Sequence, residues 1–152
     1  MGARVTFSVV ERPETLVAGT VLRSPAMAIE GVRRIRVQQA WHEMLKRKLP
    51  GRTGTAYIDY LPEMDSYQTH VLGYQCSSID DLEPGDVLAR VPAGQFAVFT
   101  ASGENLGDVV AGLWQSIWEA EERGKITRAY SGDFEHYPTR NTAEVFVAIT
   151  QE

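Results

Sequence analysis

The chain has 152 residues and a hydrophobic fraction of 43%, which is enough apolar material for the core of one globular domain. Its net charge of −5 argues against a nucleic-acid binder, because neutralising phosphates requires a basic surface. The one cysteine cannot form an internal disulfide, the three histidines lack metal-ligand spacing, and no apolar run is long enough to span a membrane. We therefore expect a single cytoplasmic domain without a metal or cofactor.

The first half of the chain predicts strands on either side of one helix. Residues 5–21 alternate between apolar and polar side chains, as in one or two strands broken near Pro13. The helix that follows has an apolar face formed by Val37, Ala40, Trp41, Met44 and Leu45. Two further strands are predicted at 55–60 and 68–77, with turn residues between them.

The second half predicts the same order of elements after a connector at 79–86. Strands are expected at 87–91 and 95–100, and the last two at 128–134 and 144–150. Between these pairs lies a helix that Asn105 can cap and Gly124 can end. Its apolar stripe has helical spacing throughout and consists of Leu106, Val109, Val110, Leu113, Trp114, Ile117 and Trp118.

Aromatic landmarks match between the two halves. Trp41 and Tyr57 are 57 − 41 = 16 residues apart, and Trp114 and Tyr130 are 130 − 114 = 16 residues apart. This spacing predicts two strand-helix-strand-strand repeats, about 5–78 and 87–152, within one α+β domain that spans 1–152. We expect the repeats to be related by a pseudo-twofold axis. They would form a mostly antiparallel sheet with two long helices on one face and a central cleft.

The stretch Tyr130-Ser131-Gly132-Asp133-Phe134-Glu135-His136-Tyr137 places two carboxylates among three aromatic rings. A carboxylate beside rings that exclude water is a partner for an organic cation, or a proton-transfer group with a raised pKa. The alternative is a strand that ends in an exposed turn with solvated polar side chains. Because side chains alternate along a strand, Tyr130 and Glu135 share a face only if a bulge occurs at Gly132. Without a bulge, Glu135 pairs with Tyr137.

Several stretches resemble, in order and spacing, the GyrI-like family, also called the AraC-type or bacterial transcription-activator effector-binding domain. They are 91–99, the Leu113-Trp114 helix, 130–137 and 144–149. The resemblance implies binding of hydrophobic, often cationic, small molecules in a central cleft. The glutamate of a Phe-Glu-x-Tyr motif, here Glu135, meets the charge of the ligand. Many members have Tyr where this chain has Phe96, and no helix-turn-helix fits before Val5, so we expect a free-standing member.

The resemblance and the residues together predict a ligand-binding protein rather than an enzyme. The expected ligand-binding side chains are Trp41, Tyr57, Phe96, Trp114, Tyr130, Phe134, Glu135 and Tyr137. The two Trp side chains have an alternative interpretation as ordinary core, since they lie on apolar helical stripes.

Two other functions stay open. One is a GyrI-like hydrolase that detoxifies cyclopropane-bearing compounds, with Glu135 activating water and a phenol, Tyr130 or alternatively Tyr57 or Tyr137, as the acid. The other is an interaction or inhibitor module that binds a protein partner through its acidic surface.

Overall fold

The structure of the chain is a computed structural model that describes residues 7–25, 39–40, 42–44, 46–47, 53–61 and 67–150, with the backbone alone at 22–25, 59–61 and 67–68. In this part of the chain one long helix, α2 (Leu106–Glu122), and one 3-10 turn, η2 (Ile79–Asp81), accompany the strands. The strands are β1 (Phe7–Arg12), β2 (Thr15–Pro25), β3 (Thr53–Leu61), β4 (Tyr67–Cys76), β5 (Val87–Val91), β6 (Gly94–Ser102), β7 (Asp133–Thr139) and β8 (Thr142–Ala148).

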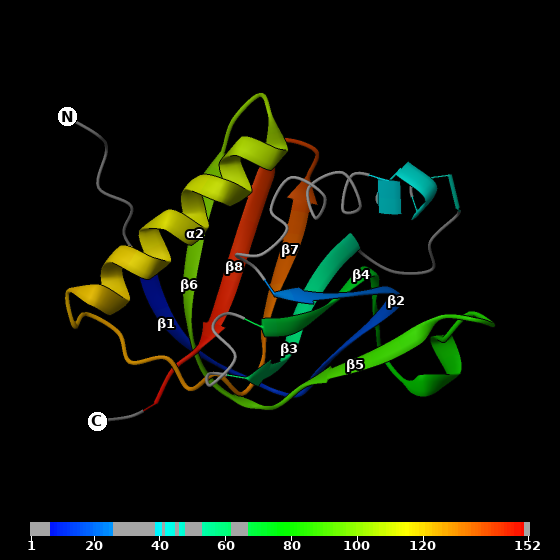
Figure 1. Cartoon of the computed structure of the whole chain (residues 1–152), viewed down its shortest axis with the longest axis horizontal. Coiled ribbons are helices and arrows are strands. Elements are labelled where there is room, and N and C mark those ends of the chain that lie inside the picture. The colour runs from blue at the N-terminus through cyan, green and yellow to red at the C-terminus, as the bar shows by residue number, and fades with distance from the viewer. Residues whose placement is uncertain are drawn as a thin grey trace.

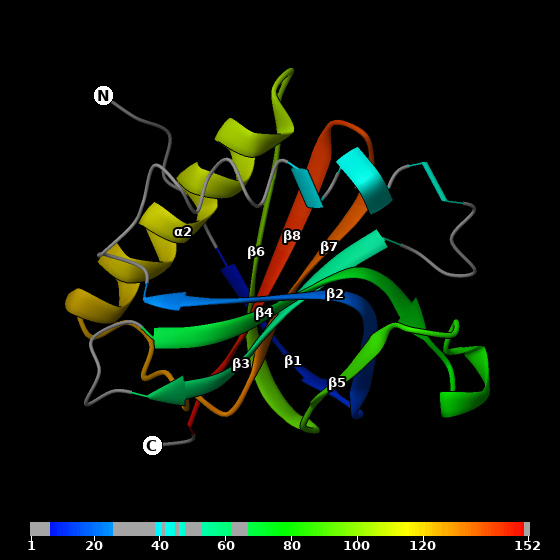
Figure 2. The same cartoon turned by 45° about the vertical axis from the view of Figure 1, so that its right-hand side comes forward.

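The eight strands form one sheet in the order β1-β6-β8-β7-β3-β4-β2-β5, and neighbouring strands are antiparallel. This confirms the predicted mostly antiparallel sheet of an α+β domain. The second half supplies the adjacent strands β6, β8 and β7, and the first half supplies β3, β4 and β2, so the two groups join at the centre of the sheet where β7 pairs with β3. At the edges the halves exchange strands, since β1 pairs with β6 and β5 pairs with β2. The two groups run in clearly different directions (Figure 2), as expected of a strongly twisted sheet. The twofold relation between the repeats stays a prediction.

The helix α2 lies across β6 and β8 on one face of the sheet (Figure 1). It begins as predicted, because the Asn105 side chain accepts a hydrogen bond from the Asp108 backbone N–H at 3.0 Å. Its last residue is Glu122, and Arg123 is the C-cap, followed by Gly124 at a φ of +73°. Its apolar stripe packs on the sheet through the buried Leu113 and Ile117, whereas Trp118 of the predicted stripe is more than half exposed.

The predicted first helix falls mostly outside the described residues, and so does Trp41. Residues 39–40 and 42–44 are helical, and the Met44 side chain is buried. No helix among the described residues combines the length and the apolar character needed to cross a membrane.

The core consists of two clusters on opposite faces of the sheet. The cluster under α2 contains Ala97, Phe99, Leu113, Ile117, Ala120, Ile126, Ala143, Val145 and Val147. The cluster on the other face contains Val17, Ala56, Val71, Ala89, Val91, Phe96, Phe134, Phe146 and Ala148. Strands β6, β7 and β8 contribute to a core on each face, because alternate side chains point to opposite sides. A strand buried on both faces does not show the apolar-polar alternation of a strand with one solvent-exposed face.

Two glycines allow β2 and β4 to pack closely. Gly19 and Gly73 are paired in register. A Cβ atom at Gly19 would lie 1.8 Å from the Leu72 carbonyl oxygen, and one at Gly73 would lie 2.1 Å from the Ala18 carbonyl oxygen. Either contact is far inside van der Waals distance, so this crossing requires glycine at both positions.

The strand predicted at 128–134 is wrong in its position. The structure has irregular backbone there until β7 begins at Asp133. Tyr130 has a φ of +56°, and Gly132 has a φ of +148°. Positive φ values do not continue a strand, so the chain turns before β7 enters the centre of the sheet. Consequently Tyr57 and Tyr130 do not occupy matched strand positions.

Candidate functional site

The central strand β7 presents Glu135 on the same face of the sheet as α2. Its register with β3 places Glu135 opposite Thr55 and Asp133 opposite Tyr57. In turn, β3 pairs with β4 so that Tyr57 lies opposite His70. Alternation along the strands puts all five of these side chains on one face. Residues from three strands therefore converge beside the helix.

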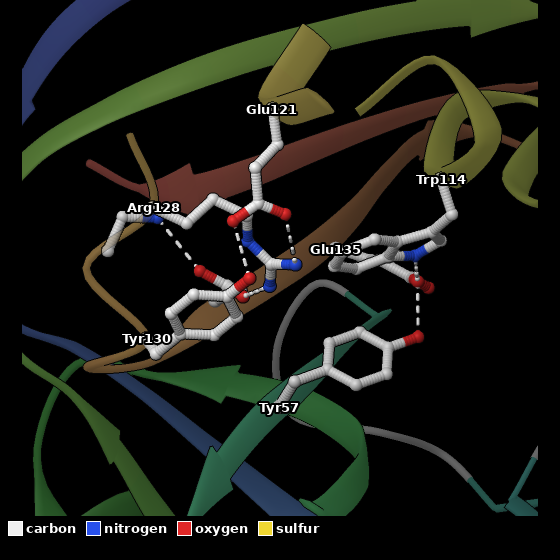
Figure 3. Close-up of polar contacts among 8 residues, drawn as sticks. Tyr57, Trp114, Glu121, Arg128, Tyr130 and Glu135 are labelled. Atoms are coloured by element: carbon white, nitrogen blue, oxygen red, sulfur yellow. Dashed lines mark hydrogen bonds and ion pairs between the residues drawn. The ribbon is translucent and has the colours of Figure 1, made fainter. Parts of the chain in front are cut away.

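The Glu135 side chain is buried, with a relative exposure of 2% for the residue, and it accepts hydrogen bonds from three ring-bearing side chains. The Trp114 Nε1–H donates to Oε2 at 2.6 Å, and the Tyr57 hydroxyl donates to the same oxygen. The Tyr137 hydroxyl donates to Oε1. Figure 3 shows the carboxylate next to the Trp114 indole, with the Tyr57 ring below it. We call Thr55, Tyr57, Trp114, Glu135 and Tyr137 the Glu135 cluster.

Ring contacts hold these donors in place. The Tyr57 ring lies edge-on to Trp114, with centroids 5.1 Å apart, and edge-on to His70, with centroids 4.5 Å apart. Trp114 also contacts the ring of Trp118 at 6.3 Å, and more than half of Trp118 is exposed. Edge-to-face pairs at these distances are favourable, so the phenol and the indole are both preorganised toward the carboxylate.

Burial and the neighbouring carboxylate raise the pKa of the Tyr137 phenol well above its ordinary value, because its anion would be desolvated and would face the charge of Glu135. The phenol therefore keeps its proton and donates a hydrogen bond to Glu135. The Thr55 hydroxyl completes this chain by donating to the Tyr137 oxygen at 3.0 Å.

A second group of polar side chains lies on the same face, beside the Glu135 cluster. It consists of Glu121, Arg128, Tyr130 and Asp133, and we call it the Arg128 cluster. Arg128 Nη2 donates to Asp133 Oδ2 at 2.6 Å, and the Ala148 backbone N–H donates to Asp133 Oδ1 at 2.8 Å. The Tyr130 hydroxyl donates to Glu121, and the Tyr130 ring lies over the Arg128 guanidinium at 4.4 Å. Figure 3 shows the Tyr130 ring on the other side of the Arg128 guanidinium from Trp114.

The structure brings four of the predicted ligand-binding residues together: Tyr57, Trp114, Glu135 and Tyr137. Of the two alternatives for Glu135, it follows the one in which Glu135 pairs with Tyr137. Tyr130 belongs to the Arg128 cluster instead, so the phenols beside Glu135 are Tyr57 and Tyr137. The prediction for Trp41 lies outside the described residues.

Two predicted residues lie on the opposite face of the sheet. Phe96 and Phe134 have a relative exposure of 1% each and meet edge-to-face at 5.9 Å in the core cluster of that face. The Phe134 ring is also stacked on Phe146 at 4.4 Å. The structure therefore does not bring either ring to Glu135, and the missing hydroxyl at Phe96 concerns the core of the other face.

Sequence reasoning missed Thr55, His70 and Arg128. Thr55 could have been found, because it lies two residues before Tyr57 and so shares its face. His70 could have been found from the predicted hairpin, since strands on either side of the turn bring it opposite Tyr57. Arg128 had no such signal, because it lies in irregular chain.

Comparison with known proteins gives consistent results. The sequence profile of a family described as Cass2, integron-associated effector binding protein, matches residues 8–149. A Bacillus subtilis (strain 168) protein named YobU, described as a candidate transcriptional regulator, is 27% identical over 138 residues, which cover 80% of this chain and 84% of that protein.

Solved structures with the same fold include the integron cassette protein VCH_CASS2 from the mobile metagenome of Vibrio cholerae. It has a TM-score of 0.79 and 22% identity, and the match covers 95% of each chain. SAV2435, solved bound to tetraphenylphosphonium, has a TM-score of 0.71 and 11% identity over 95% of this chain and 94% of that one. The C-terminal domain of EcmrR has a TM-score of 0.61 and 12% identity over 97% and 99%. These likenesses show a shared α+β fold.

Proposed function

This chain belongs to the family of integron-associated effector-binding proteins, and from that membership we propose that it binds a hydrophobic, cationic small molecule with Glu135 as the counter-charge. The predicted resemblance to GyrI-like effector-binding proteins is confirmed by this membership, which indicates a small-molecule effector. The chemistry of the ligand and the residues that hold it are our proposal.

The observation that carries the proposal is the burial of Glu135 among ring-bearing donors. Desolvating a carboxylate is costly, and the chain offsets that cost with donors from Trp114, Tyr57 and Tyr137, which are neutral. These donors stabilise the carboxylate without adding a positive charge of their own. A cation that approached it would gain an interaction strengthened by the low local polarity.

The rings of the Glu135 cluster suit the apolar part of such a ligand. A cation over a desolvated ring gains about 0.5 to 2 kcal/mol, and a contact with an ionised carboxylate contributes about 1.5 to 3 kcal/mol. Both contributions favour delocalised cations with flat aromatic substituents. Tetraphenylphosphonium, the ligand present in the SAV2435 structure, has this chemistry.

Calorimetric titration with tetraphenylphosphonium and with its neutral analogue triphenylphosphine oxide tests the proposal. We expect wild type to bind the cation at least about tenfold more tightly than the neutral analogue. The neutral compound lacks the contact with an ionised carboxylate, which corresponds to about 1.4 kcal/mol or more. Glu135→Gln should abolish this preference while it keeps the shape of the side chain.

Glu144→Gln is the matched control. Glu144 lies on the opposite face of the sheet, opposite His136, and is partly exposed. We expect this variant to retain the cation preference of wild type. Equal affinity of wild type for the two compounds, or an equal loss of preference in both variants, would contradict the proposal. Turnover of an electrophilic ligand that required Glu135 would instead support the hydrolase.

A further inference from the structure

One side chain, Trp114, joins the Arg128 cluster to the Glu135 cluster. The Arg128 guanidinium carbon lies 5.6 Å from the Trp114 ring centroid, and the Nε1–H of the same indole donates to Glu135. Figure 3 shows the guanidinium between the Tyr130 and Trp114 rings. We propose that Arg128 is a positioning residue that fixes the Trp114 indole against Glu135 and thereby sets the geometry of the ligand site.

The backbone around Arg128 is held against the end of β8. Arg128 forms a bridge with Ile149. On either side, the Ala129 N–H donates to the Ala148 carbonyl and the Thr150 N–H donates to the Thr127 carbonyl, both at 2.9 Å. This pairing fixes the origin of the Arg128 side chain although the segment is outside the named strands.

The guanidinium is held by carboxylates from two elements. Asp133 of β7 accepts from Nη2 at 2.6 Å, and Glu121 of α2 lies 4.0 Å from Nη1. Asp133 is itself oriented by the Ala148 N–H. The guanidinium is planar and its donors have a fixed geometry, so contacts with two carboxylates fix the orientation of its plane. It can therefore present a defined face to a ring.

The remaining face of the guanidinium is covered by Tyr130 at 4.4 Å. Tyr130 adopts a φ of +56°, a left-handed conformation that is unfavourable for a residue with a Cβ atom. Such conformations persist where the surroundings determine them. Here the hydrogen bond of its hydroxyl to Glu121 and the stacking over Arg128 hold the ring in place.

A purely stabilising role does not account well for this arrangement. Removing two charges from water is costly, and well-packed apolar side chains are often at least as stable as a buried ion pair. An apolar side chain would not present a flat cationic face to the indole. A lysine would keep the charge without the plane. The geometry therefore favours a role for Arg128 in orienting Trp114.

The indole N–H resonance of Trp114 in the ligand-free protein provides a direct test, assigned by its loss in Trp114→Phe. In wild type we expect a downfield resonance that exchanges slowly with solvent, because the N–H donates to a buried carboxylate. In Arg128→Met we expect a shift upfield and exchange about tenfold or more faster, since the indole is no longer held. Arg128→Lys should change in the same direction by a smaller amount. Arg90→Met, at an exposed ion pair with Glu14, is the matched control and should leave the resonance unchanged.

The effect of Arg128→Met on ligand affinity rests on the proposed function. The effect on the indole resonance does not, because it is measured without a ligand. If tetraphenylphosphonium binds, its dissociation constant should rise about tenfold in Arg128→Met. A changed indole without any binding to wild type would refute the proposed function and leave the positioning role supported. An unchanged indole in folded Arg128→Met, even with a lowered melting temperature, would overturn the positioning role. If that variant does not fold, an unchanged indole in Arg128→Lys, which retains the charge opposite Asp133, would overturn it.

Discussion

Two carboxylates on the same strand, two residues apart and on the same face, have different partners. Asp133 is fully buried beside the Arg128 guanidinium and accepts a backbone hydrogen bond from Ala148. Glu135 is as deeply buried but accepts from two phenols and an indole. The difference shows how one strand can carry, side by side, a carboxylate in an ion pair and a carboxylate that accepts from neutral ring-bearing donors. Asp133 belongs to an ion pair of the fold, whereas Glu135 has donors suited to a ligand site.

Asp133→Asn should have the largest effect on stability. It removes one partner of a buried ion pair and leaves the Arg128 charge without that partner, which costs about 3 to 5 kcal/mol in the free energy of unfolding. Urea unfolding monitored by circular dichroism measures this loss. Asp80→Asn, at an exposed position in η2, serves as control and should change the free energy of unfolding by no more than about 0.5 kcal/mol. A loss below about 1 kcal/mol at Asp133 would erase the distinction between the two carboxylates.

Asp86 accepts hydrogen bonds from both a guanidinium and a phenol, and its substitution should have an intermediate effect on the free energy of unfolding. Arg47 donates to its two oxygens at 2.9 and 2.7 Å, and the Tyr74 hydroxyl donates at 2.7 Å. Because Arg47 remains about one-third exposed, Asp86→Asn should cost about 1 to 2 kcal/mol, less than the buried pair.

The Arg47–Asp86 pair should make the stability of the protein depend on pH. The hydrogen bond from Arg47, followed by that from Tyr74, lowers the pKa of Asp86 below its ordinary value of about 4. The unfolded chain therefore takes up this proton at a higher pH than the folded chain does. The contribution is present above about pH 4 and is lost as the pH falls through the lower, folded pKa. Unfolding measured against pH should show the gap between wild type and Asp86→Asn closing in acid. A gap that widens in acid would contradict this assignment.

Glu135→Gln should have the smallest effect on stability. The amide oxygen still accepts a hydrogen bond from a ring donor, and the variant no longer desolvates a charge, so we expect a loss below about 1 kcal/mol. The same unfolding measurement as for Asp133→Asn gives the comparison. A loss as large as that of Asp133→Asn would mean that Glu135 is structural as well.

The fold was predictable where apolar side chains recur with a single period along an element, as they do in α2. The stripe of α2 and its cap at Asn105 determine the helix, and Pro13 separates β1 from β2. The pattern of β7 is different, because Phe134 packs on one face and Glu135 lies buried on the other. Both faces of such a strand are buried although one carries polar side chains, so hydrophobicity did not mark its bounds and they were misplaced.

The candidate site was predictable only in part, for reasons of register. Tyr57, Trp114, Glu135 and Tyr137 were identified by their chemistry, and the structure brings them together. Tyr130 was assigned by its spacing from Trp114, but its positive φ removes it from the strand that the spacing assumed. Contacts such as that of Arg128 with Trp114 depend on how irregular chain returns to the sheet, and periodicity contains no information about that.

The most direct test of the account is the position of a bound cation. Tetraphenylarsonium has the shape and charge of tetraphenylphosphonium, and its arsenic atom can be located by anomalous diffraction in crystals of the complex. We predict one anomalous peak within about 6 Å of the Glu135 carboxylate, the range over which a cation contacts the surrounding rings. A peak bound elsewhere on the chain, with the surroundings of Glu135 empty of arsenic, would contradict the account.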